Sequence, residues 1–286
     1  MKPFDYSTAF QRNIGFLSKV EQDQVRNARV AIAGLGGTGG AQVHAFARLG
    51  VGNFTLADLD TYELANFNRQ LGATMHTIGH PKVEVAKEII HGINPEADVR
   101  QLASGITQET IDNFLDGVNL VVDSLDFYCF KERFLLYAAA RKKNIWVLTA
   151  PPLGFGFTLL FFDPNGMSFE DYFGFRKEMS EHELTISLFA GIAPRPFMLK
   201  YLNMEGLDFG THRLPSVGAA PFMIAGVMAT EAVKLITGKG QTLAVPTIQQ
   251  YDAMLNRFSR RTYLMGMRSP LQKLRRAIIA KKLPAG

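Results

Sequence analysis

Polar side chains that could take part in chemistry gather in one short stretch, ADLDTYELANFNRQ (57–70). Asn66, Asn68 and Arg69 lie close together in it, and Lys82 begins the next segment with helical spacing. Each residue alone is equally well explained by a helix cap or a solvated loop. Together they favour a ligand, because one arginine and one lysine near a phosphate-binding loop suit a triphosphate better than a pyrophosphate already held by backbone groups.

A glycine-rich loop, GLGGTGG (34–40), precedes this stretch and joins an apolar run to a segment with helical spacing. It satisfies the pattern G-x-G-x-x-G, and its candidate nucleotide-binding residues are Gly34, Gly36, Gly37 and Gly39. Asp58 lies 24 positions after Gly34, where a carboxylate can accept hydrogen bonds from ribose hydroxyls. The pattern predicts a nucleotide and points first to NAD, and a tight turn without a ligand is the alternative.

Two carboxylates follow a later apolar run, in VVDSLDF (121–127). Asp123 and Asp126 would lie where the carboxyl ends of parallel strands meet, the edge at which such sheets bind ligands. A carboxylate in that position can hold Mg²⁺ against phosphate oxygens. The sequence therefore predicts a nucleotide bound with magnesium at this edge.

Apolar runs alternate with segments of helical spacing through the first half of the chain. Strands are expected at 29–34, 53–58, 97–102, 118–124, 145–150 and 155–163, the last a candidate for antiparallel pairing. Helices are expected at 39–50, 82–93, 107–115 and 131–143. The alternation indicates an α/β fold with a doubly wound, mostly parallel sheet.

The second half is less regular. Residues 187–202 form a candidate helix broken by two prolines, and 219–238 predict a long apolar helix that ends at Gly238. Residues 245–253 and 257–265 alternate like the two strands of a hairpin. A C-terminal helix would place basic residues around an apolar face made of Leu271, Leu274, Ile278 and Leu283.

The 286-residue chain contains a single cysteine, Cys129, which excludes an intrachain disulfide framework and a zinc site built from cysteines. A reducing, cytoplasmic setting fits this composition best. The start of the chain lacks the apolar segment of a signal peptide. The long uncharged run 145–162 contains two prolines and two glycines, so we expect two buried strands there and no transmembrane segment.

These segments resemble the ThiF/MoeB/HesA family, the adenylyltransferases that are similar to ubiquitin-activating enzymes. The matching pieces span most of residues 10–256 in the family's order: GLGGTGG, GVGNFTLADLDTYELANFNRQ, GHPKVEVAKEIIHGINPEADV, VVDSLDF, MATEAVKLITG and QYDAM. The resemblance implies an adenylation domain at 1–256, with a Rossmann-like nucleotide-binding half at about 25–150 and a substrate-facing half at about 151–256. Residues 257–286 would add a last strand and a basic amphipathic tail.

The resemblance also implies a reaction. A carboxylate attacks the α-phosphate of MgATP and yields an acyl-adenylate and pyrophosphate. Asp58 would hold the ribose, and the phosphates would contact Asn66, Arg69 and Lys82. Asp126 would bind Mg²⁺. Ile106 would lie against adenine, and the enzyme would be a homodimer in which Arg12 reaches the ATP of the partner subunit.

The sequence departs from the family's pattern at three places. MoeB-like members bind structural zinc through two CxxC pairs, but residues 170–177 and 267–274 contain no cysteine here. We therefore expect no structural zinc, and packing of Tyr172, Phe173 and Phe175 in its place. The catalytic cysteine of some relatives is also absent, so Cys129 is expected to be a small buried residue. Phe127 stands where an asparagine would be expected after Asp126.

Three functions remain open at this point: an ATP-dependent adenylyltransferase, an NAD(P)-binding oxidoreductase and a non-catalytic nucleotide-binding scaffold. The substrate would carry a carboxylate, as a peptide C-terminus, a small acid or a modified tRNA base, and Arg195 and His212 are candidates to contact it. Residues 257–282 hold nine of the 31 basic residues and no acid. This basic tail could contact nucleic acid, an anionic membrane surface or a partner subunit.

Overall fold

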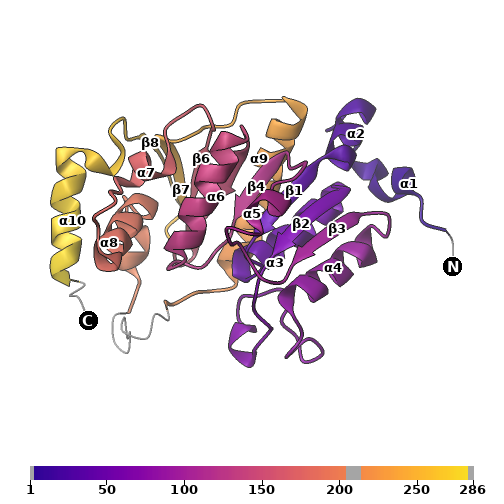
Figure 1. The fold of residues 1–286 in the computed structure, drawn as a ribbon, viewed down its shortest axis with the longest axis horizontal. Coiled ribbons are helices and arrows are strands. Elements are labelled where there is room, and N and C mark those ends of the chain that lie inside the picture. The colour runs from indigo at the N-terminus through magenta and orange to yellow at the C-terminus, as the bar shows by residue number, and fades with distance from the viewer. Residues whose placement is uncertain (1–2, 204–213, 283–286) are drawn as a thin grey trace.

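The computed structural model describes residues 3–203 and 214–282, and one eight-stranded sheet runs through them in the order β3-β2-β1-β4-β5-β6-β7-β8 (Figure 1). The first five strands of the chain are parallel: β1 (Arg29–Ala33), β2 (Asn53–Ala57), β3 (Asp98–Leu102), β4 (Leu120–Asp123) and β5 (Trp146–Thr149). The remaining three pair antiparallel: β6 (Gly156–Phe162), β7 (Thr247–Asp252) and β8 (Arg257–Thr262). The predicted fold class is confirmed, and β3 and β8 form the two edges.

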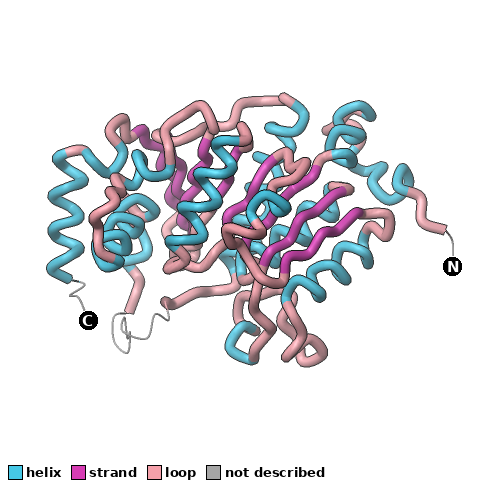
Figure 2. Tube along the Cα trace, viewed as in Figure 1, coloured by secondary structure: helices cyan, strands magenta, loops and turns pink. Residues whose placement is uncertain are grey.

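Helices cover both faces of the sheet (Figure 2). One face packs against α2 (Lys19–Asn27), α3 (Gly37–Leu49), α4 (Lys82–Ile93) and α9 (Ala219–Thr237). The other packs against α5 (Ile111–Phe114), α6 (Phe130–Lys142), α7 (Phe169–Phe173) and α8 (Glu181–Ile192). Strand side chains alternate between these two cores, as the pleat requires: Val30 and Ile32 face one core, and Ala31 and Ala33 face the other.

Short elements and α10 complete the chain. They are α1 (Tyr6–Phe10), η1 (Gln11–Asn13), η2 (Leu64–Asn66), η3 (Phe197–Lys200), η5 (Gly266–Arg268) and α10 (Pro270–Lys282). The helix expected at 107–115 begins only at Ile111, because the side chain of Thr110 bonds the amide of Thr107 and the carbonyl of Gly105. The division into domains at 150 and 256 stays a prediction. His212 and Leu283 lie outside the described residues.

Among the residues that the structure describes, one helix, α9, is long and apolar enough by length and composition to span a membrane. It packs along α3 and contributes Ile224, Met228 and Ala232 to the core beneath it. It also buries the charged side chain of Glu231, whose carboxylate lies 2.5 Å from the ammonium of Lys234. In this fold the apolar composition of α9 therefore matches its place against the sheet.

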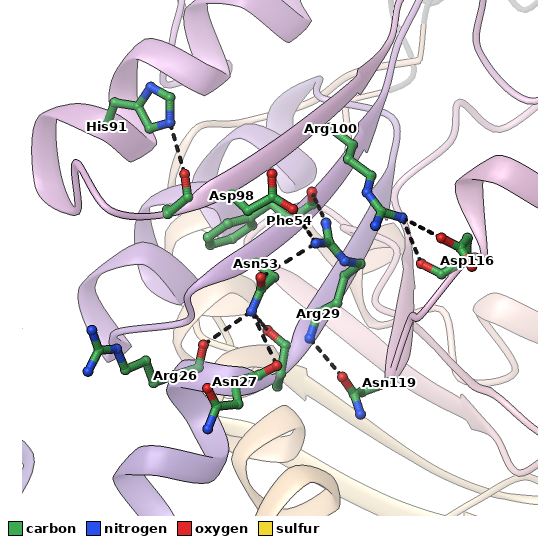
Figure 3. A network of polar contacts seen from close by, with 12 residues as sticks. Arg26, Asn27, Arg29, Asn53, Phe54, His91, Asp98, Arg100, Asp116 and Asn119 are labelled. Atoms are coloured by element: carbon green, nitrogen blue, oxygen red, sulfur yellow. Dashed lines mark hydrogen bonds and ion pairs between the residues drawn. The ribbon is translucent and has the colours of Figure 1, made fainter.

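The amino ends of the parallel strands are joined by polar contacts (Figure 3). The buried guanidinium of Arg29 donates to the carbonyl of Phe54 at 3.0 Å and forms an ion pair with Asp98. These contacts bridge β1, β2 and β3, where Arg29 pairs with Asn53 and Asn53 with Asp98. The network fixes the register of the strands from the end opposite the glycine loop.

The two segments without the family's cysteine pairs lie together in the structure. Tyr172, Phe173 and Phe175 are buried, and their rings contact one another beside α8. Arg268 forms an ion pair with Asp171 at 3.0 Å and so joins the two segments. The expected aromatic packing is confirmed. Within the described ranges no group of three or more histidine, cysteine or acidic residues is arranged to hold a metal ion.

Candidate nucleotide site at the carboxyl edge of the sheet

The glycine loop connects β1 to α3 at the edge where the parallel strands end, called the carboxyl edge below. Gly34 has a φ of +88°, and a Cβ there would overlap the carbonyl of Ser124. A Cβ on Gly39 would overlap the carbonyl of Gly34. These two glycines therefore let the loop, α3 and the end of β4 approach closely, whatever ligand is bound.

Gly36 and Gly37 differ from those two. A Cβ on Gly37 would make ordinary contact with the carbonyl oxygen of Arg69 at 3.4 Å. Gly36 is the N-cap of α3 and is half-buried, and the nearest atom to a Cβ there would be Nε2 of Gln70 at an ordinary contact distance of 3.7 Å. Gln70 is buried, and its Oε1 has no hydrogen-bond partner within the described part of the chain. A partly exposed backbone beside an unsatisfied polar atom fits a polar ligand at Gly36.

Asp58 follows β2 directly and closes one side of the loop. Its carboxylate accepts hydrogen bonds from the amide of Leu35 at 2.6 Å and the amide of Asp60 at 2.9 Å. Burial raises the pKa of Asp58, and the nearby positive charge of Lys82 opposes this effect. The carboxylate is thus held against the glycine loop before any ligand arrives.

Lys82 is the first residue of α4, and it is only 5% exposed. Its ammonium lies 2.8 Å from Oδ2 of Asp60, a side chain that is half exposed. The backbone amide of Lys82 also donates to the carbonyl of Asp60 at 3.0 Å. Because a buried ammonium requires an anionic partner, the ion pair with Asp60 holds the ammonium of Lys82 at the carboxyl edge, near Asp58.

The polar stretch after β2 folds into η2 and a turn. Asn66 uses its Oδ1 to accept from the amide of Glu63, so at least part of its role is to cap this turn. Arg69 is half-buried, and its Nη1 donates to the carbonyl of Ala65 at 3.0 Å and to Oδ1 of Asn68 at 2.9 Å. Nδ2 of Asn68 donates to the carbonyl of Ser216, which ties the stretch to the start of α9.

The two carboxylates at the end of β4 and in the loop that follows it have different surroundings. Asp123 is buried, and its Oδ2 accepts from Nε of Arg133 and from the hydroxyl of Tyr137, each at 3.0 Å. Asp126 is exposed and lies on the loop that leaves β4. Of the two, Asp126 is therefore the carboxylate that a metal ion could reach.

Arg133 also fixes the loop that carries Asp126. Its Nη1 donates to the carbonyls of Asp126 at 2.8 Å and Phe127 at 3.0 Å, and its Nη2 donates to the carbonyl of Leu125 at 2.5 Å. Sequence reasoning missed this residue. The available signal was an arginine on the helix after a strand that ends in aspartate, a placement that brings the two together across the βα turn.

The remaining candidates lie at different places. Ile106 is buried in the core after β3, next to Leu102. Arg12 is exposed on η1, and Arg195 is exposed beside β8, with Nη1 3.4 Å from Oγ of Ser259. Cys129 is half-buried, where we had expected a buried residue, and burial raises the pKa of its thiol. A raised pKa disfavours the thiolate that a nucleophile requires.

A sequence model described as the ThiF family matches residues 10–270, more than nine-tenths of the chain. The chain belongs to the ThiF family. The matched region contains every residue discussed at the carboxyl edge, from the glycine loop to Asp126. It also contains Arg12 near its start and Arg195 in its second half.

Individual relatives match this chain over different lengths, some over less than half of it and others over most of it. The tRNA threonylcarbamoyladenosine dehydratase of Bacillus subtilis is 41% identical over 123 residues, which are 43% of this chain and 48% of the relative. The chain thus spans about half the length of several curated relatives it matches, that one and its Haemophilus influenzae counterpart among them. The molybdopterin-synthase adenylyltransferase of Escherichia coli is 28% identical over 242 residues, covering 83% of this chain and 84% of the relative.

Solved structures confirm the fold. Escherichia coli MccB, crystallised with ATP, superposes with a TM-score of 0.69 at 20% identity and covers 94% of this chain and 75% of its own. Selenomethionine PaaA superposes with a TM-score of 0.68 at 17% identity, covering 91% and 74%. The architecture described above therefore also occurs in these two solved proteins.

Proposed function

We propose that this chain is an ATP-dependent adenylyltransferase that activates a carboxylate as an acyl-adenylate and releases pyrophosphate. The main support is Lys82, a buried ammonium that pairs with Asp60 near Asp58 at the carboxyl edge, where the glycine loop also lies. Hydride transfer between NAD and a substrate has no use for this cation. Adenylation needs it, because negative charge on the transferred phosphate must be stabilised by fixed positive charge.

In this proposal ATP lies along the carboxyl edge. The carboxylate of Asp58 accepts hydrogen bonds from the ribose hydroxyls, and the backbone at Gly36 allows the sugar and phosphates to approach the loop closely. Asn66, Arg69 and Lys82 contact the phosphates. Ile106 would supply an apolar contact to adenine. To contact the phosphates, Arg69 must give up its present hydrogen bonds to Ala65 and Asn68. This is feasible because both partners are exposed and lie within one turn of Arg69.

Asp126 is the proposed ligand for Mg²⁺. Proteins commonly hold this ion through one or two carboxylates, with waters and substrate phosphates completing the octahedron. A single exposed carboxylate at the carboxyl edge fits that requirement, and Asp123 is excluded by its bonds to Arg133 and Tyr137. When bound, the ion would offset charge on the phosphate oxygens.

The chemistry is a displacement at the α-phosphate. An oxygen of the substrate carboxylate forms a bond to the phosphorus as the bond to the bridging oxygen of pyrophosphate breaks. Lys82 and Arg69 hold the phosphates and stabilise the charge that leaves with pyrophosphate. The protein supplies position and charge, and no covalent intermediate with a side chain is required.

We also propose a homodimer in which Arg12 reaches the ATP of the partner subunit. Arg12 is exposed, and so are Ile14 and Phe16 in the following turn and Val20 at the start of α2, with Phe16 at 87%. Exposed apolar side chains in one segment are typical of an interface.

Mixing Arg12→Ala with Lys82→Met chains should restore about a quarter of wild-type activity, since half of randomly formed dimers would contain one complete site. No recovery on mixing would count against a shared site.

The substrate is proposed as a carboxylate on a peptide C-terminus, a small acid or a modified tRNA base. The names of the relatives support two of these classes, because one relative is named for a modified tRNA nucleoside and another for the adenylylation of a synthase. A cytoplasmic location is part of the proposal, since the single cysteine suits a reducing compartment.

The test is exchange of labelled pyrophosphate into ATP, with a panel of amino acids, peptides ending in glycine, and tRNA. Exchange that depends on one class of carboxylate would support the proposal. A parallel measurement compares the shift in unfolding temperature caused by MgATP with that caused by NAD. Stabilisation by NAD alone would refute the proposal. Stabilisation by MgATP without exchange across the panel would favour a non-catalytic scaffold.

A further inference from the structure

Helix α10 packs on the body through a mostly polar side, which also places Ile279 against the core. Nη1 of Arg275 donates to the carbonyl of Pro194 at 2.5 Å, and Nη1 of Arg276 donates to Oγ of Ser187, a residue of α8, at 2.8 Å. Gln272, on the same side, is almost completely buried. The amphipathic pattern alone suggests the opposite arrangement, with the apolar face against the core.

The apolar face of α10 is consequently turned outward. Leu271, Leu274 and Ile278 are 61%, 60% and 50% exposed, and their spacing of three and four residues aligns them along the helix. Lys273 and Lys281 are exposed beside them. We call these five residues the α10 surface. In Figure 1, α10 lies at one end of the long axis of the molecule, so no other described element projects beyond it.

The charge of this region restricts what can cover the α10 surface. Residues 257–282 contain nine basic residues and no acid. A second copy packed α10 against α10 would bring like charges together. Nucleic acid would satisfy the lysines but would leave three large apolar side chains without a partner. An anionic bilayer surface suits both the lysines and the apolar side chains, because it accepts apolar side chains at the acyl boundary and attracts cations at the headgroups.

We propose that α10 lies on an anionic lipid surface, with Leu271, Leu274 and Ile278 inserted and Lys273 and Lys281 at the headgroups. The inward arginines hold the helix on α8 and so present the α10 surface as a rigid unit. Helix α10 packs on α8 and η5, whereas the glycine loop and Asp126 belong to the β1–α3 and β4–α6 connections, so we expect lipid binding to leave the nucleotide site open. This inference does not depend on the proposed adenylation activity.

Sedimentation of the full-length protein with lipid vesicles tests the proposal. At about 0.1 M salt it should sediment with vesicles of mixed phosphatidylcholine and phosphatidylglycerol and remain in solution with pure phosphatidylcholine. Replacing Lys273 and Lys281 by glutamine should weaken binding roughly 5-fold for each lysine. The triple variant Leu271→Ser, Leu274→Ser and Ile278→Ser should lose binding, because serine contributes little to insertion.

A matched control changes apolar residues of similar exposure elsewhere: Leu59→Ser, Leu64→Ser and Met75→Ser. This variant should sediment as wild type does, and unfolding midpoints would show that both triple variants are folded. Equal binding of the two triple variants would overturn the proposal, as would binding to neutral and anionic vesicles alike. A dimer that dissociates in the α10 triple variant, with no sedimentation of wild type, would assign the α10 surface to a second copy and overturn it too.

Discussion

Arg133 holds the loop of Asp126, and its replacement by methionine tests that anchor. The change keeps an unbranched side chain of similar length and removes every guanidinium donor. Asp123, whose side chain is 1% exposed, would keep only the hydroxyl of Tyr137 and the amide of Leu125 as partners. Three carbonyls of residues 125–127 would lose their donor at the same time.

The expected loss of stability follows from burial. Removing one partner of a buried ion pair costs about 3–5 kcal/mol, chiefly because the other charge stays buried without compensation. Both side chains here are less than a tenth exposed, so solvent screening does not reduce this figure much. Arg133→Met should therefore lower the unfolding free energy by about 3–5 kcal/mol. Arg141→Met, on the exposed side of the same helix, should cost no more than about 1 kcal/mol, since among the described residues Arg141 donates to a single carbonyl, that of Gly166.

Urea unfolding at neutral pH gives both numbers. The double variant Asp123→Asn with Arg133→Met should be more stable than Arg133→Met alone, because it removes the uncompensated charge. If Arg133→Met loses no more than Arg141→Met, or if the double variant is the least stable of the set, the reasoning is wrong. Where the variant remains folded, pyrophosphate exchange should fall on the order of 10- to 100-fold from displacement of Asp126.

Three further outcomes are expected. Gly39→Ala should destabilise the fold by about 1–3 kcal/mol or more, because the added Cβ would overlap the backbone. Gly36→Ala should cost less and should mainly weaken the binding of MgATP. Denaturation with and without nucleotide would separate the two effects. Burial raises the pKa of Asp58 in the folded protein above the unfolded-state value of 3.8. The unfolding free energy of the wild type should therefore fall as the pH rises from 3.8 through the folded-state pKa, because ionisation of Asp58 weakens the folded state. Asp58→Asn should match the wild type in stability below this window and exceed it at neutral pH, as urea titrations at several pH values would show. Lys82→Met should abolish the thermal shift caused by MgATP with little change in the unfolding midpoint, because the partner, Asp60, is half exposed.

The parallel half of the fold could be predicted from sequence because local and global signals agree there. Each strand is a short apolar run and each crossover has helical spacing, so the expected and observed bounds of α4 coincide at 82–93. The N-terminal helix α2 was not predicted, although Ser18 and Glu21 form a capping box that marks its start. The helix buries only Gln22 and Val25, so its sequence lacks the repeated apolar positions from which a helix is predicted.

The candidate site was less accessible to prediction. Sequence spacing identified Gly36, Asp58 and Lys82, which the structure brings to one edge. It could not decide which of Asp123 and Asp126 is buried, because that depends on a side chain from the following helix. In the same way, periodicity found the apolar face of α10 but not its direction, which is set by contacts of two arginines with a distant loop and α8.

Within residues 3–203 and 214–282, the order of the sheet leaves β3 and β8 with one unpaired backbone edge each, and both carry charged side chains. β8 exposes Arg257, Arg260 and Arg261, and β3 carries Asp98 and Arg100. Charges on terminal strands discourage two molecules from joining their sheets into a longer one. Part of the positive charge near the C-terminus thus acts as protection against self-association, and neutralising those three arginines should make concentrated solutions of the protein precipitate.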